Sequence, residues 1–409
     1  MGRTVLIAWE YGFGFGHLGH VAAAAEGFKA QGCTVWLALK RPDLLYRLPP
    51  ITVDAVLAAP SLQRPFAAIP ITSMADILAA IGFDDPNELE GVVRAWQAVF
   101  DVAKPDLVVG EYAPCAVLAA ELRGLPTAML GTGFMVPPAS DPTPGFSTTA
   151  EGDVARRRAA DARIFRPMEA VARRLGAASR LPSSLGALNA RSLPLLTTWR
   201  AFDHYGARPS TPYFGPLRGA GGTARPEWPD LPGPRLFAYF GGDKPAPPAV
   251  LEALRRTRWP AILYAPADRL PAADHWTIAS APVDLAHVAG RADLVLSRVG
   301  HGTICEVARA GTPQLFLPHT SETMLLAAAV CRTGLGLVRH ARTATAEDVI
   351  ALSEQILTSD PIRERCEAAM KALQRYDGVE EAERLAATAL RHYGLDGSRH
   401  TPLPAALAS

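Results

Sequence analysis

Segment 297–306, in the second half of the chain, combines small residues with an arginine in an order suited to binding an anion. It follows an apolar run typical of a buried strand and opens a helical pattern. Backbone N–H groups and the dipole of a helix N-terminus favour negative charge there. Arg298 adds a planar cation that pairs well with phosphate, and Glu306, one turn further on, is placed to bind a ribose hydroxyl. The alternative is an ordinary glycine-rich turn in which Thr303 is the helix N-cap and Glu306 completes a capping box.

A second glycine-rich segment, 12–20, carries two histidines directly after an apolar strand pattern. Imidazole is suited to general-base work near neutral pH, so His17 or His20 is a candidate proton acceptor. For either histidine alone, the alternative is a helix-cap or loop residue. The glycines resemble part of a dinucleotide-binding fingerprint, but the acidic residue that completes such a fingerprint is missing near position 39.

Glu111 lies at the carboxyl end of another apolar run, at the same edge of the predicted sheet as the first glycine-rich segment. A carboxylate in that place can orient an imidazole and stabilise its cation. Asp106 precedes the same run, and we interpret it as a solvated acid. The pair Asp84 and Asp85 is interpreted as a solvated helix cap.

Short apolar runs alternate with helical patterns in both halves of the chain, which predicts parallel sheets with crossover helices. The predicted strands are 4–8, 33–39, 106–110, 127–130, 193–198, 236–240, 261–264, 294–297 and 314–317. The predicted helices are 21–30, 114–122, 154–175, 303–310, 323–333, 347–357, 361–375, 379–393 and one starting at 248. Residues 136–153 are predicted to form a loop.

A stretch rich in glycine and proline, 217–234, predicts an interdomain linker. We therefore expect an α/β protein with two Rossmann-like, doubly wound parallel-sheet domains that face a central cleft, with ligands at the carboxyl ends of the strands. The expected boundaries are 1–217 for the first domain, 218–233 for the linker and 234–380 for the second domain. A C-terminal helix in 381–409 is expected to pack back toward the first domain.

The composition excludes several classes of partner. Of the 409 residues, 41 are basic and 40 are acidic, so no charge excess predicts binding to nucleic acid. The five cysteines are scattered without metal-ligand spacing, which predicts neither structural zinc nor disulfides and favours a reducing cytoplasm. No run approaches the roughly 20 apolar residues of a membrane span, so we expect a cytoplasmic protein without an integral membrane segment.

These segments, in this order, resemble the bacterial-type nucleotide-sugar-dependent glycosyltransferases of family 1, which have the GT-B fold, over most of the chain. The family pattern G-H-x-x-P-x-x-x-L-A-x-x-L-x-x-x-G-H-x-V is matched by Gly16, His17, Ala25, Gly32 and Val35, with Phe28 at a leucine position and His20 in place of the proline. The donor-binding pattern of the second half is matched by Gly300, Gly302, Thr303, Glu306, Gly311, Pro313, Pro318 and Glu322. Segment 202–217 also resembles the family's segment before the linker.

The resemblance implies roles for these residues. It makes His17 the catalytic base and Glu111, where aspartate is usual, its partner acid. It assigns the diphosphate to Gly302 and Thr303, the ribose to Glu306 and the sugar hydroxyls to Glu322. Further donor-binding residues are predicted at Gly241, Gly242, Arg298, Gly300, His301 and Thr323.

Two of these positions depart from the family pattern. Arg298 replaces the family's phosphate-binding histidine, and Thr323 replaces its sugar-binding glutamine. The shorter side chain of Thr323 makes a deoxyhexose or another unusual sugar a candidate.

The expected function is transfer, with inversion, of a hexose or deoxyhexose from a UDP- or dTDP-sugar to a small-molecule acceptor. We expect no cofactor besides this donor and no metal, because Arg298 and the helix N-terminus can stabilise the leaving diphosphate. Two rival functions remain open. One is a GT-B-fold UDP-sugar epimerase, and the other is a non-catalytic GT-B auxiliary or binding protein, against which the retention of His17 and Glu111 weighs.

Acceptor contacts are predicted at Phe13, Phe15 and Phe134 and in the 60–90 and 134–146 regions, which we interpret as variable loops. The aromatic side chains favour an apolar or aromatic acceptor. The alternative is that these side chains are packed into the core.

Overall fold

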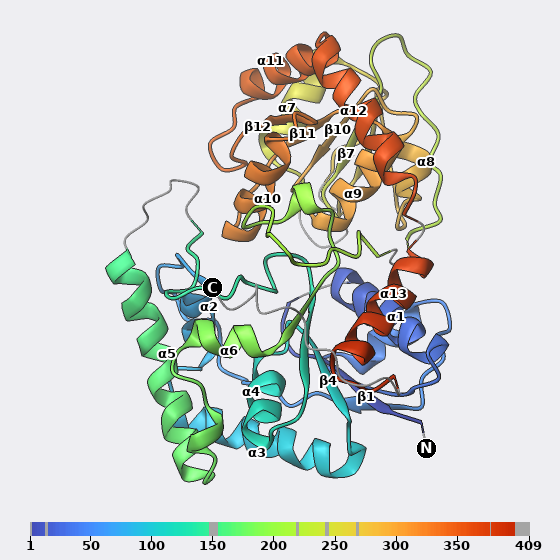
Figure 1. Cartoon of the computed structure of the whole chain (residues 1–409). Coiled ribbons are helices and arrows are strands. Elements are labelled where there is room, and N and C mark those ends of the chain that lie inside the picture. Colours follow the sequence, from blue (N-terminus) through green and yellow to red (C-terminus); the bar gives the residue numbers. More distant parts are fainter. Residues whose placement is uncertain are drawn as a thin grey trace. The chain divides into compact units, whose positions relative to one another are not determined.

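The computed structural model describes residues 2–12, 15–146, 154–217, 221–241, 245–266, 270–376 and 378–396. The chain divides into two compact units, the first formed by residues 1–220 with 377–409 and the second by residues 221–376 (Figure 1). The sequence predicts the corresponding boundaries at 217/218 and 380/381. The last described helix, α13 (Val379–His392), thus belongs to the first unit.

The first unit is built on a six-stranded sheet in which every pair of neighbouring strands is parallel, in the order β3-β2-β1-β4-β5-β6. Its strands are β1 (Thr4–Trp9), β2 (Thr34–Leu39), β3 (Ala55–Ala58), β4 (Leu107–Glu111), β5 (Thr127–Gly131) and β6 (Leu193–Leu196). The central pair is in a register that places Trp9 opposite Glu111. The residues that follow β1 therefore meet the end of β4 at one edge of the sheet.

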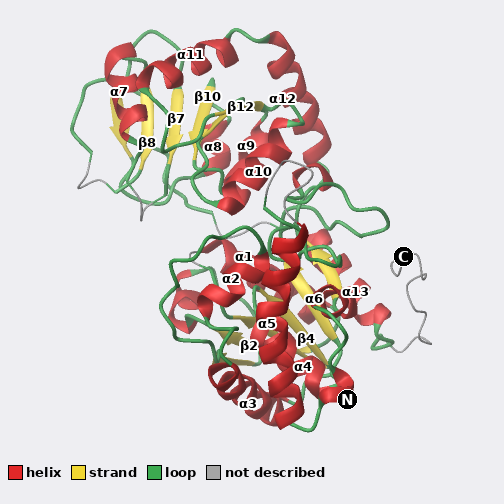
Figure 2. Ribbon diagram, turned by 90° about the vertical axis from the view of Figure 1, so that its left-hand side faces the viewer, coloured by secondary structure: helices red, strands yellow, loops and turns green. Residues whose placement is uncertain are grey.

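Helices cover both faces of this sheet (Figure 2). They are α1 (Phe15–Ala30), α2 (Met74–Ile81), α3 (Pro86–Ala103), α4 (Pro114–Arg123), α5 (Val154–Arg174), α6 (Leu185–Arg191) and α13, with 3-10 turns η1 (Pro42–Arg47), η2 (Ala178–Arg180) and η3 (Arg200–Phe202). Helices α1 and α13 lie side by side (Figure 1) and bury Phe28 and Leu385 against Val5 and Ile7 of β1 in one apolar core. They approach closely because Gly27 has no side chain: a Cβ there would overlap the Ala382 carbonyl.

The second unit repeats the architecture with the strand order β12-β11-β10-β7-β8-β9, again all parallel. Its strands are β7 (Leu236–Tyr239), β8 (Ala261–Tyr264), β9 (Trp276–Ile278), β10 (Leu294–Ser297), β11 (Gln314–Phe316) and β12 (Gly336–Val338). Its helices are α7 (Pro248–Thr257), α8 (Leu285–Ala289), α9 (His301–Ala310), α10 (Ser321–Cys331), α11 (Ala346–Leu357) and α12 (Asp360–Leu373). Numbered within each unit, both sheets have the order 3-2-1-4-5-6, which confirms the prediction of two doubly wound parallel sheets.

The predicted elements differ from the observed ones at helix starts and sheet edges. Helix α1 begins at Phe15 rather than 21, and α9 begins at His301 rather than 303, so both glycine-rich segments run into the first turn of a helix. The edge strands β3, β9 and β12 and the helices α2, α3, α6 and α8 were not predicted. Within the 60–90 region, α2 and the start of α3 are helical, with Asp85 as the N-cap of α3, whereas 60–73 and 82–85 lie outside helices and strands. The interpretation of that region as loops was therefore wrong for residues 74–81 and 86–90.

In a sheet of this order, strands 1 to 3 are added toward one edge of the sheet, and strands 4 to 6 are added toward the opposite edge. This switch occurs between the first and fourth strands, and ligands bind beside the carboxyl ends at that point. The reversal lies between β1 and β4 in the first unit and between β7 and β10 in the second. Both glycine-rich segments, and Glu111, stand at these two places.

Candidate active site

The first unit brings His17 and Glu111 together. The Nδ1 atom of His17, in the first turn of α1, lies 2.9 Å from both carboxylate oxygens of Glu111, the last residue of β4. The Glu111 side chain is fully buried, whereas that of His17 is 11% exposed. An Nδ1–H donated to the carboxylate leaves Nε2 as the proton-accepting atom of the ring, which is the arrangement a general base needs.

Two aromatic rings and a glycine fix the plane of the His17 imidazole. Trp9 and Tyr112 both stack on it, with ring centroids 5.9 Å and 6.1 Å from that of His17. Gly12 lies against the ring edge, and a Cβ at this position would overlap Nε2. Gly12 also has φ +87°, a conformation that a side chain would strain. Glycine at this position is therefore required twice over, by the backbone and by the imidazole.

Glu111 is a charged carboxylate in spite of its burial. Desolvation raises its pKa. The positive charge of His17 and the hydrogen bonds from His17 and His20 lower the pKa by a larger amount, so that the net pKa is about 2. The buried charge is thus compensated by the imidazoles rather than by solvent.

A second buried carboxyl group, that of Glu10, anchors the loop between β4 and α4. Its two oxygens accept hydrogen bonds from the backbone N–H groups of Cys115 (3.0 Å) and Ala116 (2.6 Å) at the N-terminus of α4. Burial raises the pKa of Glu10 to about 8, against these backbone hydrogen bonds. The loop that Glu10 holds contains Tyr112, whose φ of +47° is unusual for a tyrosine. Glu10 therefore helps to keep the Tyr112 ring on His17.

A pocket of the first unit adjoins the dyad, because Tyr112, which stacks on His17, also lines the pocket. Four of the chain's seven methionines line it, and none of the described lining residues carries a charge. The lining residues are Met74, Leu78, Phe83, Gly110, Tyr112, Ala113, Pro114, Val117, Met129, Met135, Pro137, Thr143, Met168, Leu185, Leu188 and Asn189. Methionine is flexible and polarisable and fits irregular apolar shapes, so the pocket suits an uncharged, mainly apolar molecule.

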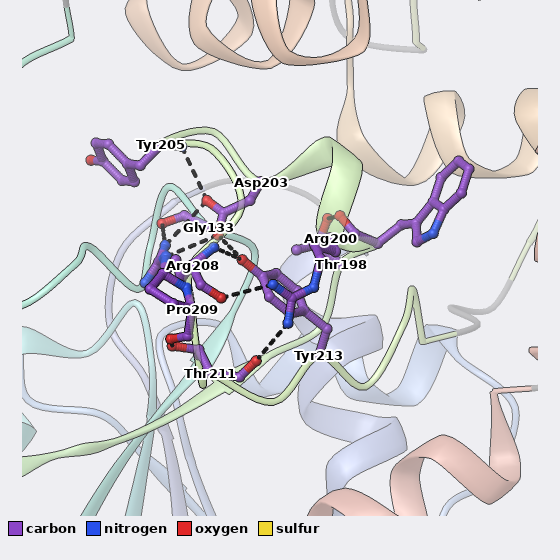
Figure 3. Close-up of polar contacts among 10 residues, drawn as sticks. Gly133, Thr198, Arg200, Asp203, Tyr205, Arg208, Pro209, Thr211 and Tyr213 are labelled. Atoms are coloured by element: carbon purple, nitrogen blue, oxygen red, sulfur yellow. Dashed lines mark hydrogen bonds and ion pairs between the residues drawn. The ribbon is translucent and has the colours of Figure 1, made fainter. Parts of the chain in front are cut away.

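A polar network around Asp203 (Figure 3) holds the loop that contains the pocket residue Met135. The fully buried Asp203 carboxylate pairs with Arg208 at 2.9 Å and accepts a hydrogen bond of 2.7 Å from the Tyr213 hydroxyl. Arg208 also donates to the Gly133 carbonyl at 3.2 Å, two residues before the pocket residue Met135. A Cβ at Gly133 would overlap the Asp203 carboxylate. The segment after β6 thereby fixes the loop after β5.

The predicted acceptor residues differ in their burial in the structure. Phe134 is only 4% exposed and packs between Phe146 and His204, with centroid distances of 5.1 Å and 5.7 Å. It does not line the pocket, which favours the core alternative for Phe134. Phe15 is 43% exposed at the start of α1, and Phe13 lies outside the described residues.

In the second unit, several predicted donor residues gather where β7, β10 and β11 end. Gly300 is the N-cap of α9, so no side chain caps this helix. The alternative with Thr303 as N-cap is therefore wrong: Thr303 lies inside the first turn, beside His301 and Gly302. A Cβ at Gly302 would meet no atom within 4 Å, so the backbone there is open to a ligand. Glu306 follows, partly exposed, in the second turn.

Arg298 bridges two loops of the second unit. Its guanidinium donates to the Pro245 carbonyl and lies over the Phe240 ring, 5.8 Å from the centroid. Gly241, with φ +84°, follows Phe240, and Gly242 lies outside the described residues. Val299 has φ +69°, which is strained for a β-branched residue. The turn between β10 and α9 is thus held in a conformation that costs energy, as is common at ligand-binding turns.

Glu322 and Thr323 lie in the first turn of α10. Thr323 forms a capping box with Thr320, and its Oγ1 also accepts a hydrogen bond of 3.0 Å from the His319 backbone. The Thr323 side chain therefore has a structural task at the position where the family pattern has a sugar-binding glutamine. Glu322 is partly exposed on the same turn.

Within the described parts of the chain, no three His, Cys, Asp or Glu side chains are grouped to hold a metal ion. No described helix is long and apolar enough to cross a membrane.

Comparison with known proteins gives the class. Residues 280–383, about a quarter of the chain, match the glycosyltransferase family 28 C-terminal domain. No curated protein matches the chain significantly.

Solved structures match over nearly the whole length. CalG4, the calicheamicin glycosyltransferase, is 18% identical with a TM-score of 0.70, over 95% of this chain and 98% of its own. The glycotransferase of kitacinnamycin is 15% identical with a TM-score of 0.68, over the same shares of the two chains. SnogD from Streptomyces nogalater is 18% identical with a TM-score of 0.62, over 95% of this chain and all of its own.

Further matches have been solved with ligands. They are the spinosyn rhamnosyltransferase SpnG, in complexes with spinosyn aglycone (TM-score 0.61) and with thymidine diphosphate (TM-score 0.58), and VinC with dTDP (TM-score 0.58).

The chain thus has the two-domain GT-B fold, and its residues 280–383 match a glycosyltransferase domain. The resemblance to bacterial-type family 1 enzymes, drawn from the motifs, is confirmed at this level.

Several residues of the site were not found by sequence reasoning. Tyr112 directly follows Glu111, and Trp9 and Glu10 stand at the end of the strand before the glycine-rich segment, so their position next to strand ends was the available signal. The pocket methionines gave no such signal, because they are scattered over α2, α5, β5 and a loop.

Proposed function

We propose that the enzyme transfers a sugar from a nucleoside-diphosphate sugar to a hydroxyl group of an uncharged, mainly apolar acceptor, with inversion at the anomeric carbon. The observation that carries this proposal is the contact of His17 with Glu111 beside the methionine-lined pocket. It supplies a base and an acceptor site in one unit of a glycosyltransferase.

The acceptor binds in the pocket of the first unit, with its nucleophilic hydroxyl toward Tyr112 and His17. His17 Nε2 takes the proton of this hydroxyl, and the oxygen forms a bond to the anomeric carbon as the bond to the diphosphate breaks. The imidazolium that results is stabilised by Glu111 at 2.9 Å. The similar structure of SpnG in complex with a spinosyn aglycone supports a small-molecule acceptor.

The donor binds to the second unit at the N-terminus of α9. Its diphosphate faces the backbone of Gly302 and Thr303, where the helix dipole and Arg298 offset the charge of the leaving group. Glu306 and Glu322 accept hydrogen bonds from the ribose and the sugar. Structures of SpnG and VinC with thymidine diphosphate favour a dTDP-sugar, and UDP-sugars are the alternative donors.

The test is a panel of UDP- and dTDP-sugars, scored for thermal shift and for donor hydrolysis, followed by transfer to apolar acceptors. His17→Ala should leave donor binding unchanged and lower turnover by about two orders of magnitude, as expected when a general base is lost. Donor binding without any turnover would favour a non-catalytic binding protein, and conversion of the free donor to its sugar epimer would favour an epimerase. A His17→Ala variant with full turnover would remove His17 as the base.

A further inference from the structure

Glu111 contacts a second imidazole besides that of His17. The Nδ1 atom of His20 lies 3.4 Å from Glu111 Oε1, the oxygen that His17 Nδ1 also approaches at 2.9 Å. His17 and His20 are three residues apart on α1, so both side chains point from one face of the helix toward β4. The His20 side chain is 14% exposed, and the Glu111 side chain is fully buried. One carboxylate therefore serves two imidazoles in a mostly enclosed site.

We propose that His20 is a positioning residue of the transfer reaction. It fixes the Glu111 carboxylate and, when protonated, reduces the stabilisation that this carboxylate gives to the His17 cation. This inference rests on the proposed role of His17 as the base. The usual residue of the family pattern at this place is proline, which has neither a proton to donate nor a charge to gain, so this device belongs to the present chain.

The charge balance gives the direction of the effect. With His20 neutral, the three side chains carry a net charge of −1 before His17 takes the acceptor's proton and 0 afterwards. With His20 protonated, the net charge goes from 0 to +1 in a site with little solvent. The second change is the more costly one, because a positive charge is left uncompensated in a low-dielectric environment. Activity therefore requires both histidines to be neutral.

Several other titratable groups around α1 are engaged elsewhere. Glu10 accepts from Cys115 and Ala116, the Tyr11 hydroxyl accepts from the Leu62 backbone, and Lys40 donates to the Gly12 carbonyl at 3.2 Å. On η1, Asp43 pairs with Arg41, and further along α1, Lys29 pairs with Asp54. On α13, the Glu381 side chain accepts a hydrogen bond from the Gly378 backbone, and Arg384 donates to the Tyr213 carbonyl. Strand β5 contributes no titratable side chain. Each of these groups has a partner other than the Glu111 carboxylate, so His17 and His20 are the groups that share it.

The experiment compares wild type, His20→Gln and His20→Ala, with His287→Gln on α8 of the second unit as a matched control. Glutamine keeps an N–H donor for Glu111 but cannot gain a proton. In the wild type, kcat/KM should fall toward low pH by about 100-fold per pH unit, since two protons inhibit. In His20→Gln it should fall by about tenfold per unit, with a neutral-pH rate close to that of the wild type. His20→Ala should lose about 10- to 100-fold at neutral pH, which is typical when a supporting hydrogen bond is removed.

A second readout does not depend on turnover. The histidine ring signals of the full chain are followed by NMR over pH, in wild type and in His20→Gln. We expect the His17 signal to titrate in two coupled steps in the wild type and in one step in the variant. Two-step behaviour without transferase activity would uphold the coupling and reject the proposed function. Identical single-step titrations, or an acid limb with the same slope in wild type and His20→Gln, would overturn the proposal for His20.

Discussion

Neutralising Glu111 without changing its shape is the sharpest perturbation of the dyad. In Glu111→Gln the amide oxygen can still accept from His17 Nδ1, but the negative charge is gone. The Glu111 pKa falls from its ordinary value of 4.5 to about 2 in the folded protein. Each factor of ten in proton affinity corresponds to about 1.4 kcal/mol, so the carboxylate charge is favoured by about 3 kcal/mol. This net value already includes the cost of burying the carboxylate, so the attraction between Glu111 and the two imidazoles exceeds it, and the variant loses the His17 part of that attraction.

The expected result is a fall in kcat of about 100-fold, since 3 kcal/mol corresponds to roughly two factors of ten. The assay is the initial rate of sugar transfer at saturating donor, with donor affinity measured separately by calorimetry and expected to stay unchanged. Glu121→Gln is the matched control: Glu121 is also buried in the first unit, but it pairs with Arg191. A Glu111→Gln enzyme with the wild-type kcat would refute the assignment of Glu111 as the partner of the base.

The same shift predicts a dependence of stability on pH. A carboxyl group whose pKa is lowered by folding stabilises the fold fully above pH 4.5 and loses this contribution as the pH falls toward 2. Urea unfolding should therefore show wild type about 3 kcal/mol more stable than Glu111→Gln near pH 6, and the difference should shrink between pH 4.5 and 2. A difference that is the same at pH 6 and pH 2 would contradict the compensation of the buried charge by the histidines.

Three further predictions concern other parts of the molecule. Arg298→Ala should weaken binding of UDP or dTDP by about 2 kcal/mol in titration calorimetry; unchanged binding would mean that Arg298 only braces the Pro245 loop. Transfer activity in excess EDTA should keep most of its rate, whereas a loss that Mg²⁺ restores would mean that acids near the donor bind metal. Asp203→Asn should lower the free energy of unfolding by about 3 kcal/mol, as expected when a buried ion pair is broken; a loss below about 1 kcal/mol in chemical denaturation would show that Arg208 and Tyr213 find other partners.

The sequence by itself determined the class of fold and the principal residues of the site. Buried parallel strands are nearly continuous apolar runs, such as those ending at Trp9, Glu111 and Ser297, and these runs are a local signal. Parallel strands also end at a common edge of their sheet. The order of the elements along the chain was therefore enough to predict that Glu111 lies near His17.

The tertiary structure decided where helices begin. Local propensity places a glycine-rich turn at 12–20, because glycine disfavours a helix by about 1 kcal/mol per residue. Helix α1 nevertheless includes Gly16 and Gly19, because Leu18 and Val21 are fully buried in the core of the first unit. The short edge strands depend in the same way on the neighbour they pair with, so three or four residues carry too little pattern to predict them.

The pocket and the second imidazole were likewise decided by packing. The pocket methionines come from elements as far apart in sequence as α2 and α5, and only the folded chain brings them together. His20 stands at a position where the family pattern has proline, and its contact with Glu111 depends on the start of α1 and on its rotation against β4. Such contacts are made between residues distant in sequence, whereas composition and spacing report only on neighbours along the chain.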